Sequence, residues 1–507
     1  MKKSILIILS ITILLLAWQL LAMLVRLPDL VPSVPRLLST LAALFASGSF
    51  YQSVMATVLR GTIGMSISLM AAVGVSFLFY KCEWMYELFR PLLAIMRAIP
   101  VISFILLALI FLNAESIPLI IAFLTMFPLL TENLTKGIRS RRKELSIMAR
   151  QFKIGRWNRL TQVTYPQLKP FLYSGLASAL GFGWRAIIMG EVLAQCSPGI
   201  GGEMKQAQVF IAVPELIAWT IIAILISYLF DRGISWLAKQ RFPIHYNKHC
   251  GKQPVPKGNC DIRIRDISYR YGSDTVLSHF SYTFEKGFIY GITAPSGTGK
   301  TTLLNLIGNI LKPAQGEIET DFKTGIAYVF QEPELLSQLT IAENIALPLA
   351  ACQTKEMALE QAVSMLQKME LEGFANRFPN ELSFGQQQRV AIARALTYPS
   401  PLLLMDEPFK GLDEALSRRI IERIRERQGE SGQTILFTSH NPGELRLFAD
   451  PLPSSDSTPI SPFKIEIIVL QIESPRPVPC LNISSLTKRS KTVDRCFFAM
   501  PLPVSVT

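Results

Sequence analysis

Formal charge is scarce in this chain. Only 18% of its 507 residues are charged, half are apolar, and the mean hydropathy is +0.32, whereas soluble proteins have about 25% charged residues. This shortage excludes a disordered chain and argues against a wholly soluble one. Most of the charge lies after residue 250, so an apolar region precedes a soluble region. At roughly 150 residues per domain, the length suggests about three domains.

The chain also lacks a set of paired cysteines. Its seven cysteines are odd in number and scattered, which excludes a disulfide framework. The net charge of +13 could indicate a nucleic-acid partner, but only if the basic residues gathered on a soluble surface.

Long uncharged runs are present in the first half. Residues 4–25 contain no formal charge and follow Lys2 and Lys3. About 20 apolar residues in a helix cross a bilayer core, and this run is longer than the apolar core of a signal peptide. It therefore predicts an uncleaved transmembrane helix. Five further runs bring the expected number of spans to six: 55–80, 90–112, 115–133, 171–194 and 213–231.

Lysine and arginine residues set the expected orientation. The loop 132–169 contains ten of them, whereas 196–212 contains only Lys205. Because basic loops stay in the cytoplasm, this loop, the N-terminus and everything after Arg232 are expected inside. Much of the positive charge is then explained by topology, so no nucleic-acid partner is expected. Residues 1–243 predict an α-helical, multi-pass domain of the cytoplasmic membrane, in contact with lipid.

The basic loop has a pattern of its own over residues 149–170. It resembles the cytoplasmic coupling loop of binding-protein-dependent ABC import permeases, in which a glycine lies thirteen residues before a proline. Here Pro166 is in place, but Lys153 stands at the glycine position and Ile147 at the glutamate position. Residues 26–243 as a whole resemble the permeases of nitrate, sulfonate, taurine and thiamine-precursor importers. The matching stretches are 97–100, 181–191 and 199–201.

Three arginines fall in or beside the expected spans: Arg60, Arg97 and Arg185, the last followed by Glu191. Intramembrane charges mark a pathway or an ion pair by default. We expect Arg60 and Arg97 to lie near the interfaces and extend their charges toward water. Arg185 and Glu191 are six residues apart, project to different helix faces and need not pair. A cationic lining would suit an anionic substrate.

A phosphate-binding loop begins the second half. Residues 288–293 predict a short buried strand, and 303–311 an apolar helix. The loop between them follows the pattern G-x-x-x-x-G-K-[ST], with Ala294 in place of the first glycine. We expect Lys300 to reach the β- and γ-phosphates of ATP and Thr301 to bind Mg²⁺. The remaining residues expected to cradle the nucleotide are Ser296, Gly297, Thr298, Gly299 and Thr302.

An acidic pair, Asp406 and Glu407, ends the apolar run 401–405, about a hundred residues after the loop. In that position Asp406 suits Mg²⁺ binding and Glu407 suits polarisation of the attacking water.

Further residues complete a pattern: Tyr271, Gln331, Ser383, Gly385, Gln386, Asp413 and His440. Their order and spacing resemble the ATP-binding cassette family over about 190 residues. The resemblance implies an α/β P-loop domain over 259–450, with Tyr271 stacked on adenine, although an aromatic residue near a first strand can also belong to the core. It implies that Gln331 senses Mg²⁺ and the permease, and that His440 holds the γ-phosphate and water. Asp413 would contact the partner cassette, and the segment containing Ser383, Gly385 and Gln386 would close over ATP held by the opposite subunit.

Phe384 departs from the family, which has glycine at this position. The ring could point away into the helical subdomain and leave ATP binding intact, or it could make the composite site slow. We expect an active site, because the residues of the nucleotide pocket are otherwise present.

Two segments lie outside these domains. Residues 244–258 contain several glycines and prolines and predict a solvated linker. Residues 451–507 include nine prolines and one strand-like run over 465–472. We interpret this tail as the product of a reading-frame change near Asp450 and expect it to be poorly ordered; a regulatory appendage is the alternative.

The sequence therefore predicts an ATP-driven half-importer in which permease and ATPase are fused. Two cassettes must meet to build composite sites, so the resemblance implies a homodimer and a separate extracytoplasmic substrate-binding protein. The expected cargo is a small solute, either an anion such as a sulfonate or nitrate, or a thiamine precursor. An ABC exporter half and a degenerate, non-transporting ATP-binding membrane protein are the alternatives.

Overall fold

A computed structural model describes residues 2–25, 30–247, 261–272, 274–295, 297–320, 325–449 and 465–469. The chain divides into two compact units. The first comprises Met1–Arg141 and Pro166–Arg241, and the second comprises Arg142–Tyr165 and Phe242–Thr507. Part of the basic loop therefore belongs by its contacts to the second unit, although it lies within the membrane half of the sequence.

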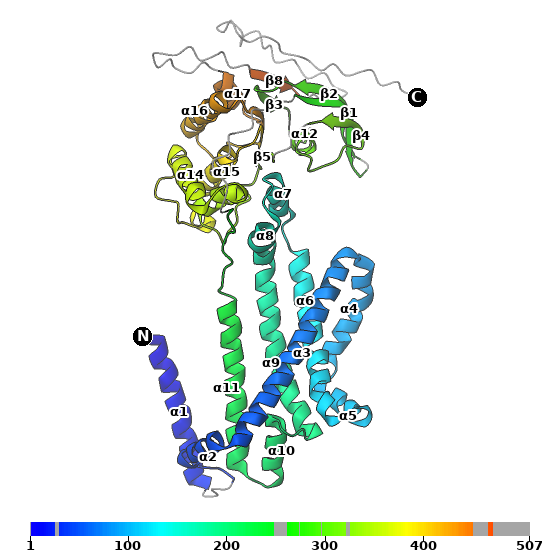
Figure 1. The fold of residues 1–507 in the computed structure, drawn as a ribbon, viewed down its shortest axis with the longest axis vertical. Helices are drawn as coiled ribbons and strands as arrows, with labels where there is room; N and C mark the ends of the chain where they lie inside the picture. The colour runs from blue at the N-terminus through cyan, green and yellow to red at the C-terminus, as the bar shows by residue number, and fades with distance from the viewer. Residues whose placement is uncertain are drawn as a thin grey trace. The chain divides into compact units, whose positions relative to one another are not determined.

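The first unit is entirely helical in its described residues (Figure 1). Its elements are α1 (Lys2–Val25), α2 (Val34–Ala46), α3 (Gly48–Lys81), α4 (Glu83–Ala98), α5 (Val101–Phe111), η1 (Ala114–Ser116), α6 (Ile117–Arg139), α9 (Tyr165–Ala194), α10 (Ile200–Val209) and α11 (Val213–Leu237). In the described residues four helical stretches are long and apolar enough to cross a membrane: Gly48–Lys81, Ala114–Arg139, Arg156–Ala194 and Val213–Leu237.

Fewer straight spans are present than the six expected. The run 90–112 was expected to cross as one helix, but it is divided into α4 and α5, which meet at an angle of 92°. Pro100 causes the break, because proline disfavours a helical residue before it and lacks the N–H that would continue the ladder. The pair counts at most as a fifth span. The first expected span coincides with α1, whose described apolar part, Thr12–Val25, is shorter than the other spans.

Small residues allow α3 and α6 to pack closely. A Cβ atom added to Gly64 of α3 would lie 2.6 Å from Cβ of Ala122 in α6. Ser68, Ala72 and Ser76 continue the same buried face of α3. Such close backbone approach is the usual means by which membrane helices associate.

Arg60 and Arg97 both have carboxylate partners, and Arg60, with only 12% of its side chain exposed, does not extend freely toward water as expected. Arg60 contacts Glu191 of α9 at 2.8 Å and Glu115 of η1 at 2.6 Å, and Arg97 pairs with Glu132. Arg185 is exposed, and Glu191 pairs with Arg60. Since two carboxylates already hold Arg60, that residue does not provide the expected cationic lining.

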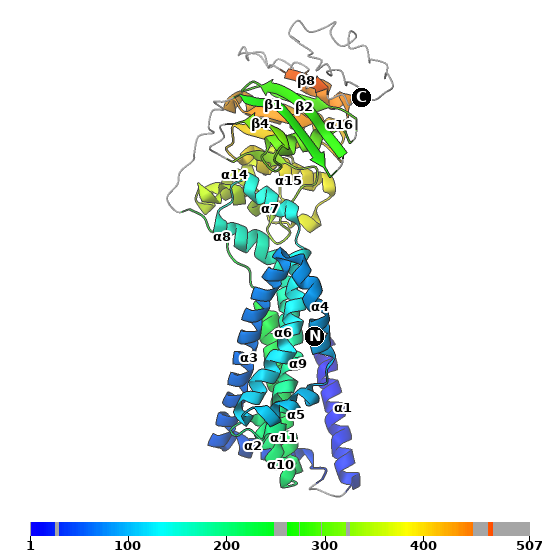
Figure 2. The same cartoon turned by 90° about the vertical axis from the view of Figure 1, so that its right-hand side faces the viewer.

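The second unit contains two sheets. The antiparallel sheet has the order β2-β1-β4, formed by Asp274–Phe284, Ile262–Tyr271 and Gln315–Glu319, and it faces the viewer in Figure 2. The parallel sheet has the order β5-β6-β7-β3-β8, formed by Ala327–Val329, Leu402–Asp406, Thr434–Thr438, Ile289–Thr293 and Ile465–Val469. The strands β3, β6 and β7 are almost wholly buried, as expected for parallel strands covered on both faces.

The helices of the cassette lie between these strands in the sequence. They are α12 (Lys300–Ile307), α13 (Ile341–Ala346), η3 (Leu347–Ala351), α14 (Lys355–Lys368), η4 (Pro379–Glu381), α15 (Phe384–Thr397), α16 (Glu414–Ser431) and α17 (Pro442–Ala449). The basic loop adds α7 (Lys143–Gln151), α8 (Arg156–Asn158) and the π-helical turn η2 (Arg159–Thr164). The core around α15 includes Ala149, Phe152 and Val163 of that loop, which explains why the loop belongs to this unit.

The strand-like run of the tail is confirmed over Ile465–Val469. This strand, β8, pairs in parallel with β3, with Ile465 opposite Ile289. The rest of the tail, and residues 248–258 of the predicted linker, lie outside the described residues.

Candidate nucleotide site

The phosphate loop joins β3 to α12. Gly297 and Gly299 have φ of +83° and +91°, values that residues with a Cβ rarely adopt. A Cβ on Gly299 would also lie 2.8 Å from Cγ1 of Val276. Ala294, at the position of the missing glycine, is not among the described residues with a positive φ, so its methyl group is tolerated. Ser296 lies outside the described residues.

The Lys300 side chain curls back over this loop. Its Nζ donates to the carbonyls of Ala294 at 2.7 Å and Pro295 at 3.0 Å, and lies 3.4 Å from Nδ1 of His440. Burial lowers the pKa of Lys300, while the charges of Glu407 and Asp406 act in the opposite direction. Thr298 closes the same turn by donating to the Pro295 carbonyl.

Asp406 and Thr301 lie together beneath the loop. Asp406 ends the buried strand β6 and accepts a hydrogen bond from Thr438 at 2.7 Å. Burial raises the pKa of Asp406, and hydrogen bonds from Thr438 and Thr301 oppose that rise. Hydroxyl and carboxylate oxygens are the ligand type that Mg²⁺ prefers, so this pair fits the predicted metal ligands, with the Gln331 amide as a third oxygen donor.

Glu407 connects two other predicted residues. Its carboxylate lies 2.5 Å from Nε2 of His440 and accepts a hydrogen bond from the Gln331 side chain at 3.1 Å. Glu407 has φ +45°, a strained conformation typical of functional sites. Its backbone N–H donates to Thr438 at 3.0 Å. The structure therefore brings Lys300, Gln331, Glu407 and His440 together from four different segments.

Thr438 was missed by the sequence analysis. It bonds both the Asp406 carboxylate and the Glu407 backbone, so one hydroxyl positions the acidic pair. A signal was present, because a polar residue ends the apolar run 435–437 just before His440.

The segment around Ser383 contacts the 411–413 loop. Ser383 and Gln386 form a capping box at the start of α15. The Ser383 hydroxyl accepts from the Gln386 N–H, and the Gln386 side chain accepts from the Ser383 N–H, so these two residues fix the first turn of the helix. A Cβ on Gly385 would lie 2.6 Å from the Gly411 carbonyl, so only glycine fits there. The Phe384 ring lies against Gly411 and is 37% exposed; it does not insert into the helical core.

Tyr271 and Asp413 make local contacts of their own. Tyr271 ends β1, is 52% exposed and contacts Tyr269 edge-to-face. Asp413 caps α16 by accepting from the Leu416 N–H at 2.8 Å. Both remain predictions as nucleotide or partner contacts.

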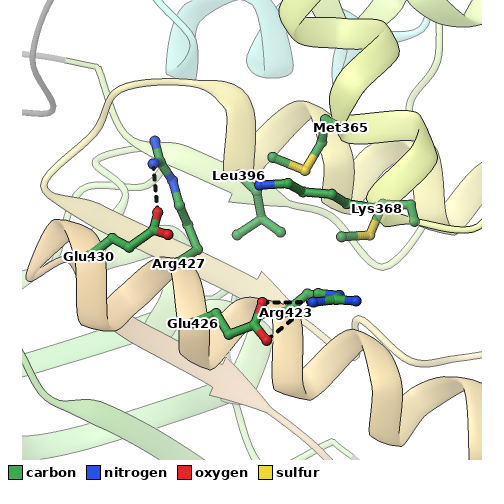
Figure 3. Close-up of a pocket in the computed structure, with 8 residues that line it drawn as sticks. Met365, Lys368, Leu396, Arg423, Glu426, Arg427 and Glu430 are labelled. Carbon is green, nitrogen blue, oxygen red and sulfur yellow. Dashed lines mark hydrogen bonds and ion pairs between the residues drawn. The ribbon is translucent and has the colours of Figure 1, made fainter. Parts of the chain in front are cut away.

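A small pocket between α14 and α16 is a different feature (Figure 3). It measures about 30 Å³, roughly the volume of one water. Four of its charged lining residues form the ion pairs Arg423–Glu426 and Arg427–Glu430. This pocket is therefore too small for a nucleotide.

Within the second unit, the basic loop packs directly on the cassette. The Gln151 carbonyl accepts from the Ile326 N–H at 3.1 Å, and its side chain donates to the Gly308 carbonyl at 2.7 Å. The Phe152 ring packs edge-to-face on Tyr398 at 5.3 Å. Lys153 has φ +46°, which explains why related loops have glycine at this position.

Two family models match successive parts of the chain: "Binding-protein-dependent transport system inner membrane component" over residues 64–241 and "ABC transporter" over 277–410. The cassette is 36% identical over 193 residues to the probable sulfate/thiosulfate import ATP-binding protein CysA of Chlorella vulgaris, covering 36% of this chain and 82% of that protein. The chain belongs to the ABC transporter family. This ABC transporter chain fuses a permease domain and a cassette, so it is a multi-pass membrane protein with its cassette in the cytoplasm.

Other relatives of this ABC transporter chain match over the cassette. The Fe(3+) ions import ATP-binding protein FbpC of Escherichia coli K12 is 35% identical over 199 residues, or 37% of this chain. The chain spans 57% of that relative's length. Among solved structures, the dimeric ATP-binding cassette MJ0796 bound to ADP and Pi is 33% identical, covering 37% of this chain and 90% of that one, with a TM-score of 0.35.

Proposed function

We propose that this chain is one half of an ATP-driven importer. The observation that carries the proposal is the convergence of Lys300, Gln331, Glu407 and His440 in a unit that also holds the docked coupling loop. The match of residues 64–241 to binding-protein-dependent permeases favours import over the exporter alternative.

In this proposal Lys300 leaves the loop carbonyls and binds the β- and γ-phosphates of ATP. Glu407 orients the attacking water and accepts its proton as the γ-phosphoryl group separates from ADP. His440, already 2.5 Å from Glu407, holds the γ-phosphate and the water. Thr301, Asp406 and Gln331 would hold Mg²⁺, which neutralises phosphate charge when bound.

The cargo is a small solute delivered by an extracytoplasmic binding protein to a homodimer. Relatives are described as importing Fe(3+) ions, 2-aminoethylphosphonate and sulfate or thiosulfate, so small ions are supported as a class. We propose an anion such as a sulfonate or nitrate as the cargo, with a thiamine precursor as the other candidate.

The proposal is tested by ATP hydrolysis of the full-length chain in lipid vesicles. Glu407→Gln should lower the rate by at least about 10²-fold, because it removes the group that accepts the proton of water. Glu332→Gln, a nearby exposed carboxylate paired with Lys410, is the matched control and should retain activity. Equal hydrolysis by Glu407→Gln and the wild type would contradict the assignment, and ATP binding without hydrolysis in either would favour a degenerate, non-transporting protein.

A further inference from the structure

Glu334 is a buried carboxylate that the nucleotide site does not use. Only 4% of the residue is exposed, and its φ is +44°. Both of its carboxylate oxygens accept hydrogen bonds from Arg142 of the coupling segment 142–165, at 2.8 and 2.9 Å. A buried charge is retained at a cost unless it is paired, so this pair is a specific connection between the segment and the cassette.

The backbone of Glu334 holds a second arginine. Its carbonyl accepts from Arg394 at 2.8 Å, and the preceding carbonyl of Pro333 accepts from the same guanidinium at 3.0 Å. Arg394 is almost fully buried in α15, the helix that begins at Phe384 beside the Ser383 cap. One residue therefore contacts the coupling segment through its side chain and α15 through its backbone.

The charges of Glu334, Arg142 and Arg394 compensate one another. Burial lowers the pKa of Arg394 to about 10, while the nearby Glu334 charge acts in the opposite direction. Burial raises the pKa of Glu334, and Arg142 counters that effect. The Phe152 ring of the coupling segment also lies 5.3 Å from the Arg394 guanidinium. The Glu334 carboxylate thus holds Arg142 through hydrogen bonds to both of its oxygens, and its charge also offsets that of Arg394.

We propose that Glu334 is a positioning residue that transmits movement between the coupling segment and α15. This inference rests on the proposed function and names residues that couple its two halves. Gln331 precedes Glu334 by three residues and contacts Glu407, so the same short segment reaches the hydrolytic cluster. Movement of Arg142 therefore displaces both α15 and Gln331 through one rigid connection.

The proposal predicts unequal effects of removing the two charges. Arg142→Gln removes the connection to the coupling segment but leaves Glu334 beside Arg394. Glu334→Gln removes the connection and also leaves a buried arginine without its nearest negative charge, so it should be the more harmful change. Arg142→Lys retains a charge and one hydrogen bond and should restore part of the coupling. Arg141→Gln is the matched control, because Arg141 contacts Tyr80 in the membrane unit.

The experiment uses the full-length chain in lipid vesicles with two readouts. One is ATP hydrolysis. The other is the labelling rate of Phe210→Cys by a membrane-impermeant maleimide, with and without MgATP and vanadate. Phe210 is 78% exposed in the loop that the charge distribution places outside the cytoplasm. The chain without Phe210→Cys gives the background labelling.

We expect ATP to change the labelling rate in the wild type and in Arg141→Gln. In Arg142→Gln, hydrolysis should persist while the ATP-dependent change falls at least about fivefold, the lower end of typical coupling strengths. A full response in Arg142→Gln, or an equal loss in Arg141→Gln, overturns the inference. A wild type that hydrolyses ATP without any labelling change also overturns it. A wild type without hydrolysis overturns the proposed function, and the inference with it.

Discussion

Glu191 and Glu115 both pair with the Arg60 guanidinium, but one carboxylate is buried and the other is exposed. The Glu191 side chain is 0% exposed and that of Glu115 is 62% exposed, while Arg60 is 12% exposed. Glu191 also accepts from the Thr57 hydroxyl at 2.9 Å and the Gly201 N–H at 3.0 Å. The buried carboxylate therefore joins α3, α9 and α10, whereas the exposed one adds a pair that solvent screens.

This difference predicts very different costs for removing each carboxylate. Glu191→Ala should destabilise the chain by about 3–5 kcal/mol, because Arg60 loses its buried partner and the Thr57 hydroxyl and Gly201 N–H lose this acceptor. Glu115→Ala should cost at most about 1 kcal/mol. Unfolding by SDS titration of the full-length chain measures both. Similar losses for the two variants would show that burial does not decide the strength of these pairs.

At the residue scale, the proximity of Lys300, Asp406 and Glu407 could be predicted from the sequence, because it depends on a loop and an acidic pair that each follow a short apolar strand. Their catalytic roles remain predictions. The partner of Arg60 could not be predicted, because Glu191 lies 131 residues away and helix packing brings the two together.

At the scale of elements, the turn after α7 holds a lysine in a backbone conformation that its side chain disfavours. Lys153 adopts a left-handed conformation that costs a residue with a side chain about 1–3 kcal/mol. The cost is accepted because Phe152 and Ile154, on either side, are buried in the cassette core. The turn is therefore fixed by its neighbours and not by its own preference.

Lys153→Gly should therefore stabilise the chain by about 0.5–1 kcal/mol, since relief of backbone strain exceeds the added freedom of the unfolded glycine. The comparison is Lys143→Gly at the start of α7, which should destabilise, because helical glycine costs about 1 kcal/mol. Thermal unfolding followed by tryptophan fluorescence separates the two. A loss of stability in Lys153→Gly would mean that the lysine side chain contributes more than its backbone costs.

Element positions were predictable where the signal was local. The predicted strand 288–293 and the apolar run 401–405 correspond to β3 and β6 within one residue at each end. The break between α4 and α5 was not predicted, because apolar length alone does not distinguish a straight span from a bent one. The order of the parallel sheet was equally beyond reach, because it depends on pairings between distant segments.

For the whole molecule, the proposed homodimer predicts which mutations can complement each other. Lys300→Ala and Ser383→Arg should each abolish hydrolysis in a homodimer. A heterodimer of the two variants should regain activity, because one composite site then contains an intact loop from one chain and an intact Ser383 segment from the other. ATP hydrolysis by heterodimers purified with two different tags is the measurement.

The control carries both mutations in one chain, paired with a wild-type chain. If sites form between chains, this heterodimer has no intact site and should be inactive. If each chain formed its own site, the wild-type chain would remain active and the first heterodimer would be dead. The two arrangements of the same mutations therefore give opposite results.

The division of the chain into units has a consequence for biosynthesis. Segment 142–165 is made before its packing partners, which include Glu334, Arg394 and Tyr398. At roughly 5–20 residues per second, about 10–50 s separate the emergence of the segment from that of its binding surface. During this interval Phe152 and its apolar neighbours have no cassette to cover them. A nascent chain stalled between residues 165 and 334 should therefore be the stage at which chaperones bind this protein most strongly.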